Sequence, residues 1–270
     1  MMAVKGIDVS SHQGQIHWGK VKAAGYDFAI VRAGWSWYAG GMNVDKLFHD
    51  HITGAQAAGL DVGVYLYSYD QSANAAKIAA KRLLELIAPY KLTYPVWFDM
   101  EYEKFNLSAG KAVNTAICKA FLEAVQAAGY YTGIYASTDF LNNYLDMSKL
   151  SEYDVWAAQY ASQCTFKGGH GMWQHGVIGS YGTKGRDYTI AGQVPGVYAN
   201  CDVNLAYKDY PGAIKAAGLN GWAVATPQES SGEMVPRGEY DIVVAERDAI
   251  RASYNGLISD LQMLVNKYKG

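Results

Sequence analysis

Four carboxylates stand where predicted strands end. They are Asp8 in GIDVSSHQG, Asp99 and Glu101 in YPVWFDMEYE, and Asp202 in YANCDVN. Side chains alternate along a strand, so Asp99 and Glu101 share one face, about 7 Å apart along the backbone. Each of two such carboxylates raises the proton affinity of the other, and an apolar wall raises it further. The pair therefore predicts a proton donor beside an ionised partner, which is what cleavage of a glycosidic bond requires.

A short phrase, KAAG or QAAG, recurs four times and predicts how these acids are positioned. It occupies residues 22–25, 56–59, 126–129 and 215–218. Each copy is typical of a helix end, because glycine adopts the left-handed conformation that stops a helix. Strand-like sequence follows the first three copies directly. The alternation of helix, glycine and strand indicates βα units.

The chain is predicted to be an α/β protein, with an irregular (β/α) barrel of the TIM type containing eight mostly parallel strands and about five helices. Loop-like sequence between residues 153 and 202 replaces some of the helices. Ser108 is the expected N-cap of the helix over residues 108–128. Further helices are expected at residues 44–58 and 73–87, and strands at 4–9, 27–33, 60–67, 94–101, 131–137, 154–160, 172–175 and 197–203.

In such barrels the active site lies at the C-terminal ends of the strands, and we expect all four acids there, with Asp202 closing the last strand. Aromatic side chains should share this rim. Pyranose rings present apolar C–H faces that stack on aromatic rings, so the rim predicts sugar binding. The expected sugar contacts are Tyr65, Tyr67, Tyr135, Trp156, Tyr160 and Trp173.

Several motifs in a fixed order make the chain resemble the muramidases of glycoside hydrolase family 25, a lysozyme type common among bacteriophage endolysins. The motifs lie within residues 6–207 and read GIDVSSHQG, GVYLYSY, PVWFDMEYE, GIYAS, DVWAAQY, MWQHG and CDVN. The resemblance implies cleavage of the β-1,4 bond between N-acetylmuramic acid and N-acetylglucosamine in peptidoglycan, without a cofactor. It matches Glu101 with the general acid, Asp99 with the acid two positions earlier, and Asp8 and Asp202 with supporting carboxylates.

Two mechanisms remain open for Asp99. It could orient the 2-acetamido group of the substrate, which then attacks, or it could attack directly; both routes predict retention of the anomeric configuration. Two other functions also remain open. One is a non-catalytic glycan-binding module that uses the aromatic rim, and the other is a hydrolase whose four acids hold a divalent metal ion. His49 and His51 point in different directions on a helix, so we assign no metal site.

Composition narrows the classes of protein. The 270 residues are 50% hydrophobic, enough for one large core, and the net charge of −2 offers no basic surface for nucleic acid. No apolar run has the length of a membrane span. The N-terminus has no apolar signal segment, so we expect synthesis in the host cytoplasm and action on the cell wall after release. Three cysteines, Cys118, Cys164 and Cys201, are expected to be reduced.

The end of the chain differs from the rest. We expect the catalytic barrel over residues 1–222, a linker rich in Pro, Ser and Gly over 223–239, and a helix over 240–270. Val243, Ile250, Leu257 and Leu264 recur every seven residues, which predicts a coiled coil that joins copies into a homo-oligomer. The alternative is a helix docked on the barrel. Met234 is a candidate start for a short tail-only product.

Overall fold

The computed structural model describes residues 3–101, 103–179, 189–224, 249 and 253. The chain forms two compact units, residues 1–225 and 226–270, and the first holds the whole barrel. Almost all of the predicted linker and heptad helix lies outside the described residues. Self-association through that helix therefore stays a prediction.

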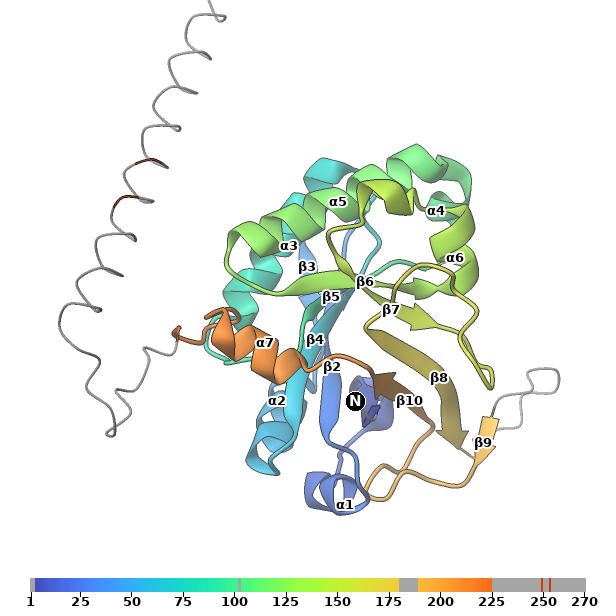
Figure 1. Cartoon of the computed structure of the whole chain (residues 1–270). Helices are drawn as coiled ribbons and strands as arrows, with labels where there is room; N and C mark the ends of the chain where they lie inside the picture. Colours follow the sequence, from blue (N-terminus) through green and yellow to red (C-terminus); the bar gives the residue numbers. More distant parts are fainter. Residues whose placement is uncertain (1–2, 102, 180–188, 225–248, 250–252, 254–270) are drawn as a thin grey trace, which may run out of the picture. The chain divides into compact units, whose positions relative to one another are not determined.

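Eight of the described strands form a closed barrel (Figure 1), in agreement with the predicted α/β fold. Their order around the barrel is β1-β10-β8-β7-β6-β5-β4-β2, and β2 pairs with β1 to close it. Two short strands, β3 (Met42–Val44) and β9 (Thr189–Ala191), extend β2 and β8. The barrel strands are β1 (Val4–Val9), β2 (Phe28–Ser36), β4 (Asp61–Tyr67), β5 (Val96–Asp99), β6 (Thr132–Ser137), β7 (Asp154–Ala158), β8 (Met172–Gly179) and β10 (Cys201–Ala206).

Among the eight barrel strands, one runs against the others. From β1 through β2 and β4 to β8 each neighbouring pair is parallel, whereas β10 is antiparallel to both β8 and β1. Asp202 is the second residue of β10 and pairs with Asp8. The expectation that Asp202 closes its strand was wrong. Because β10 is reversed, however, its first residues lie at the rim where β1 ends, so the expected meeting of the acids is preserved.

The described residues form seven α-helices and two 3-10 helices. The glycines of the four KAAG and QAAG phrases have φ angles of 83°, 77°, 82° and 64°, which confirms them as helix ends. Gly110, with φ 82°, divides the helix expected over residues 108–128 into two, so Ser108 lies in α4 and is not an N-cap. The helices are α1 (Trp18–Ala23), α2 (Phe48–Ala57), α3 (Ala73–Ile87), α4 (Lys104–Ala109), α5 (Lys111–Ala127), α6 (Thr138–Asn143) and α7 (Tyr210–Ala216), with η1 (Ser11–Gln13) and η2 (Met147–Lys149).

Helices cover the barrel unevenly. The helices α3 and α5 lie side by side over the strands β4 to β6 (Figure 1), whereas the described residues between β7 and β10 form no helix. At the other end of the barrel, α7 packs beneath the starts of the strands. There the Tyr210 hydroxyl donates to Asp154 Oδ2 (2.9 Å), at the first residue of β7, and its ring lies 5.1 Å from that of Tyr94.

Large aromatic side chains fill the barrel interior. Trp97 and Trp156 are fully buried with ring centroids 5.8 Å apart, and Tyr135 packs on Trp156 at 4.4 Å. Below them, Phe28 and Tyr94 stack at 4.3 Å. The interior is therefore a packed core, and any site for a substrate must lie above it, at the rim.

Candidate active site

A cavity of about 250 Å³ opens at the rim, and all four predicted acids line it. Five of the six aromatic residues expected to contact sugar line it as well, and Trp173 does not. The lining consists of the acids Asp8, Asp99, Glu101 and Asp202, the aromatics Tyr65, Tyr67, Tyr135, Trp156 and Tyr160, and Val9, Ser10, His12, Gln13, Arg32 and Gln174.

Strand ends deliver the acids to this cavity. Asp8 is the last residue but one of β1, and Asp99 is the last residue of β5. Glu101 follows two residues later, outside the strand ladder, and lines the same cavity as Asp99. Its backbone is fixed, because the Asn106 side chain donates to its carbonyl oxygen (3.0 Å). Residues far apart in the sequence thus converge on one volume.

Asp8 is held by two amide side chains. Gln174 Nε2 and Asn204 Nδ2 both donate to Asp8 Oδ2, at 2.9 and 2.8 Å. The carboxyl is only 6% exposed. Burial, followed by the charge of Asp202, raises its pKa to about 8, although the two amide donors oppose the shift. Asp8 therefore carries a proton through most of the neutral range.

The two amides are themselves oriented by aromatic residues. The Tyr135 hydroxyl donates to Gln174 Oε1 (2.8 Å), and Trp156 Nε1 donates to Asn204 Oδ1 (2.8 Å). These contacts direct both NH₂ groups at Asp8. Gln174 and Asn204 were not among the predicted site residues. The sequence did contain a signal for them, because Gln174 in MWQHG and Asn204 in CDVN are polar residues at inward positions of barrel strands.

Asp99 is the most enclosed of the acids, at 3% exposed, and its Oδ1 has no hydrogen-bond partner among the described residues. Burial, then the charges of Glu101 and Asp8, raise its pKa well above the ordinary value, and Arg32 acts in the opposite direction. Glu101 is only half-buried. Burial, then Glu103 and Asp202, raise the pKa of Glu101 as well. Such a shift is the one that a proton donor requires.

Two tyrosines predicted to bind sugar also hold carboxylates. The Tyr160 hydroxyl donates to Asp202 Oδ1 at 2.5 Å, and this bond opposes the rise that burial causes in the pKa of Asp202. The Tyr67 hydroxyl donates to Glu103 Oε1 at 2.6 Å. Both rings remain on the cavity wall. They can therefore orient acids and contact a substrate at the same time.

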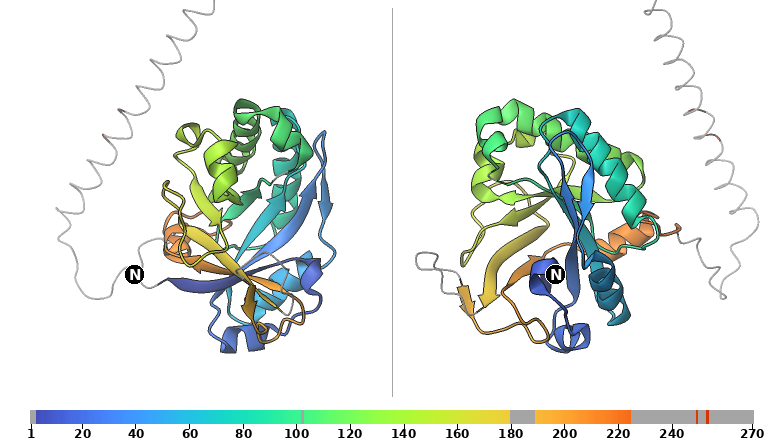
Figure 2. Two further views of the ribbon diagram at one scale, coloured as in Figure 1. Left: turned by 90° about the vertical axis from the view of Figure 1, so that its right-hand side faces the viewer. Right: turned by 180° about the vertical axis from the view of Figure 1, so that it is seen from behind.

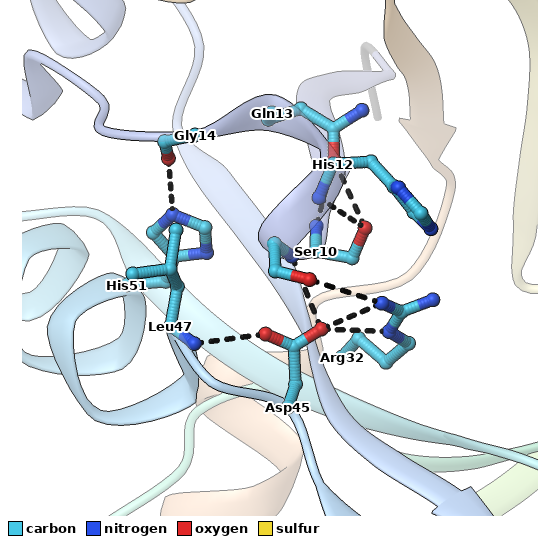
Figure 3. Close-up of polar contacts among 9 residues, drawn as sticks. Ser10, His12, Gln13, Gly14, Arg32, Asp45, Leu47 and His51 are labelled. Carbon is cyan, nitrogen blue, oxygen red and sulfur yellow. Dashed lines mark hydrogen bonds and ion pairs between the residues drawn. The ribbon is translucent and has the colours of Figure 1, made fainter.

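Among the residues that the structure describes, Arg32 is the one lysine or arginine that lines the cavity, and it was not among the predicted site residues. Its Nε and Nη2 contact Asp45 Oδ2 at 2.8 and 2.7 Å (Figure 3), and its guanidinium lies over the Trp35 ring at 5.6 Å. Asp45 also accepts from the backbone amides of Ser11 (3.1 Å) and Leu47 (2.9 Å). Arg32 Nη2 also donates to Ser11 Oγ (3.4 Å), so the guanidinium is held from two sides (Figure 3). The sequence did contain a signal for Arg32, because a charged residue within the apolar run FAIVRAG is unusual.

Trp173 corrects the sequence prediction. It precedes Gln174 on β8, and because alternate residues face opposite sides of a strand, its ring points out of the barrel while Gln174 points in. Its Nε1 donates to the Gln159 carbonyl oxygen (2.8 Å), and its ring lies 5.4 Å from that of His175. Trp156 keeps its place at the site, but as the buried floor of the cavity.

Two amide donors already occupy Asp8 Oδ2. Among the described residues no group of three or more His, Cys, Asp or Glu side chains has a geometry that could hold a metal. Within the same residues no helix is both long and apolar enough to cross a bilayer.

Comparison with known proteins identifies similar sequences. The profile of the family described as "Glycosyl hydrolases family 25" matches residues 7–182. A "Probable GH family 25 lysozyme 2" of Dictyostelium discoideum is 28% identical over 170 residues, covering 61% of this chain and 76% of that protein. The "Autolytic lysozyme" of Clostridium acetobutylicum is 24% identical over 203 residues, covering 74% of this chain and 55% of that protein.

Solved structures share the fold. The CTP1L endolysin superposes with a TM-score of 0.64 at 25% identity, over 79% of this chain and 70% of that one. The modular autolysin LytC of Streptococcus pneumoniae gives a TM-score of 0.62 at 28% identity, over 76% of this chain. The chain spans about half the length of LytC, 47%.

Proposed function

The chain belongs to glycosyl hydrolase family 25, and on that premise we propose that it hydrolyses peptidoglycan as a lysozyme, at the β-1,4 bond between N-acetylmuramic acid and N-acetylglucosamine. One observation supports this most strongly. Asp8, Asp99, Glu101 and Asp202 line one cavity, and aromatic rings suited to sugar faces line it with them.

Glu101 is the proton donor in this proposal. It is half-buried beside the cavity, and its pKa is raised by burial and by neighbouring acids. A carboxyl in that condition keeps its proton closer to neutral pH and can pass it to the glycosidic oxygen as the C–O bond breaks. When water later attacks the anomeric carbon, Glu101 takes a proton from that water and is restored.

Asp99 stabilises the positive charge that develops at the anomeric carbon. Asp99 Oδ1, which has no partner within the described part of the chain, suits a hydrogen bond from the N–H of the substrate's 2-acetamido group, whose oxygen then attacks the anomeric carbon. Direct attack by Asp99 is the alternative route, and both retain the anomeric configuration. Asp99 must be ionised in either case. Arg32 favours that state, because its charge opposes the rise in the pKa of Asp99.

Asp8 acts as a neutral group beside this pair. With a pKa of about 8 it holds a proton near neutral pH, so it adds no third negative charge to the cavity. Asp202, held by Tyr160, is the ladder partner of Asp8, and its charge helps to keep Asp8 protonated.

Analysis of digested peptidoglycan tests the proposal. The expected product is a new reducing end on muramic acid, with retained anomeric configuration in nuclear magnetic resonance spectra recorded during the reaction. A new reducing end on glucosamine would contradict the bond assignment. Binding to peptidoglycan without any new reducing end would instead select a non-catalytic glycan-binding module. Activity lost to a chelator and restored by a divalent ion would select the metal-dependent alternative.

We also propose that the protein serves as a phage endolysin, made in the host cytoplasm and released to the wall. The 25% identity to the CTP1L endolysin supports this role, whereas the likeness to autolysins gives the competing one. Lysis of cells from within, when the gene is expressed together with a membrane-permeabilising protein but not alone, is the expected result. Lysis without that protein would contradict it.

Self-association through the heptad positions completes the proposal. Copies joined at Leu257 and Leu264 would engage one wall at several points and raise avidity. Light scattering should give a mass above one chain, and replacing both leucines with aspartate should return it to one chain.

The CTP1L endolysin is described as regulated by a secondary translation product. In this chain such a product would begin at Met234, and intact-mass spectrometry of the purified protein should detect it.

A further inference from the structure

A second cavity, of about 420 Å³, lies beyond the acid cavity at the tip of the β2–β3 hairpin. We call it the hairpin cavity. Its lining residues are Tyr38, Tyr69, Gln71, Glu103, Lys104, Phe105, Asn106 and Ser108. Its volume falls in the range of small-ligand sites, and its mixture of aromatic rings and hydrogen-bonding side chains is typical of them. None of the four acids lines it, so the proposed chemistry leaves it without a role.

Aromatic rings connect the two cavities. Tyr67 lines the acid cavity, its ring centroid lies 5.0 Å from that of Tyr69, and Tyr69 lies 6.2 Å from Tyr38 in an edge arrangement. Glu103 joins them a second time, because it lines the hairpin cavity and accepts the hydrogen bond of Tyr67. A chain molecule that fills the acid cavity can therefore continue across these rings.

The far wall of the hairpin cavity is exposed yet ordered. Tyr38 is 62% exposed and the adjacent Trp37 is 51% exposed, which is unusual for two neighbouring large aromatic side chains. The backbone beneath them is tied down: Gln71 N donates to the Tyr38 carbonyl oxygen (3.2 Å), and Tyr69 N donates to Ser36 Oγ (2.9 Å). Figure 2 shows the hairpin extending beyond the barrel strands, alongside α3.

The near wall is fixed to the catalytic strand. Asn106, on α4, lines the hairpin cavity and donates to the carbonyl oxygen of Glu101. Asn114 Nδ2 in turn donates to the Asn106 carbonyl oxygen (2.8 Å). Both walls are therefore positioned before any ligand arrives, and preorganised walls lower the cost of binding.

We propose that the hairpin cavity binds a further N-acetylhexosamine unit of the same glycan strand, beyond the sugars in the acid cavity. The inference rests on the proposed function and adds a specificity for long strands to it. The apolar C–H face of the sugar stacks on Tyr38 and Tyr69, while Gln71, Glu103 and Asn106 supply partners for its hydroxyl and acetamido groups. No bond is made or broken there.

Strand length provides the test. Peptide-free glycan strands are fractionated, and KM is measured for the shortest strand that the enzyme cleaves and for one twice as long. In Tyr38→Ala, KM for the longer strand should rise about threefold to tenfold, the effect of losing one aromatic stacking partner, while KM for the shorter strand and kcat for both stay unchanged. Tyr38→Trp should preserve the preference for length. Tyr207→Ala is the control, because Tyr207 is also exposed but lines neither cavity.

Binding separates this inference from the proposed function. If the wild-type chain releases no reducing ends, the proposed function fails, and the affinities of Glu101→Gln for the same two strands still decide the inference. A loss of affinity on Tyr38→Ala that is confined to the longer strand supports the inference. An equal loss for both strands, or no loss for either, overturns it. A loss seen only with strands that carry stem peptides overturns it too, since the cavity would then bind peptide.

Discussion

Asp8 and Asp202 occupy partner positions in the antiparallel ladder between β1 and β10, so two acids from opposite ends of the barrel sequence face the same cavity. Burial and the charge of Asp202 together keep Asp8 protonated near neutral pH. Ionisation of Asp8 is therefore unfavourable in the folded chain.

Asp8→Asn should stabilise the fold, because asparagine keeps the shape and the neutral charge of the protonated acid and can still accept from Gln174 and Asn204. The pKa of the Asp8 carboxyl is about 8 in the folded chain, above its ordinary value of 3.8, so the folded state binds the proton more tightly than the unfolded state. The loss of folding free energy caused by ionising buried Asp8 is absent below about pH 4, grows with rising pH, and is complete above about pH 8. Urea unfolding should show a gain of about 2 to 5 kcal/mol at about pH 7.5 and little gain at about pH 4.

Asp50→Asn, at an exposed position on α2, is the control for that experiment. It should change the unfolding free energy little at either pH. A loss of stability in Asp8→Asn of the same size at both pH values would contradict the assignment of a buried, protonated Asp8.

Glu101→Gln should remove turbidity loss of cell-wall suspensions while leaving the thermal midpoint close to that of the wild type. Loss of a general acid lowers the rate by about a hundredfold to ten thousandfold. The amide keeps the shape of the side chain, so the cavity persists. Glu85→Gln, which alters an exposed ion pair on α3, should keep full activity. Lysis at the wild-type rate would eliminate Glu101 as the acid.

Replacing Arg32 should change the pH profile as well as the rate. Asp45 is buried, so Arg32→Gln alone would leave its charge unpaired; Arg32→Gln with Asp45→Asn removes both charges. Without Arg32 the pKa of Asp99 rises further. In a plot of kcat against pH, the rise that accompanies ionisation of Asp99 should therefore move to higher pH. At neutral pH we expect a loss of roughly tenfold, the equivalent of one pKa unit.

Arg32→Lys separates electrostatics from structure in that series. It keeps the charge and should retain most of the wild-type pH profile, although it loses the two-pronged contact with Asp45. The pKa of Asp99 can also be measured without turnover, by following the carbon-13 chemical shift of its carboxyl group through a pH titration. An unchanged Asp99 titration in the double variant would contradict the role of Arg32.

Tyr160→Phe and Trp173→Phe form a matched pair of aromatic replacements. Loss of the Tyr160 hydroxyl removes the donor to Asp202 Oδ1, so the pKa of Asp202 should rise and kcat/KM should fall about tenfold. Trp173 points away from the cavity, and its replacement should leave kcat and KM unchanged with a modest drop in the thermal midpoint. Comparable losses of kcat/KM in both variants would contradict this placement.

Much of the barrel was predictable because its signals are local. A glycine after KAAG or QAAG ends a helix wherever it occurs, and strand alternation set the positions of Asp8 and Asp99. The direction of β10 was not predictable, since alternation reads the same for parallel and antiparallel strands. Gln174, Asn204 and Arg32 were missed for a related reason. Their roles depend on partners in other strands, and one sequence does not display those pairings.

The reversal of β10 also decides where the chain leaves the barrel. A strand that starts at the acid rim must finish at the opposite end, and α7 follows it there, with Tyr210 against Tyr94 and Asp154. Asn220 stays at that end as well, since its side-chain oxygen accepts from Tyr131 N (2.7 Å) just before β6. The segment from Ala206 to Val224 therefore lies at the end of the barrel opposite the acids. It does not obstruct the mouth of the cavity, so a bulky, cross-linked polymer can approach the acids past it.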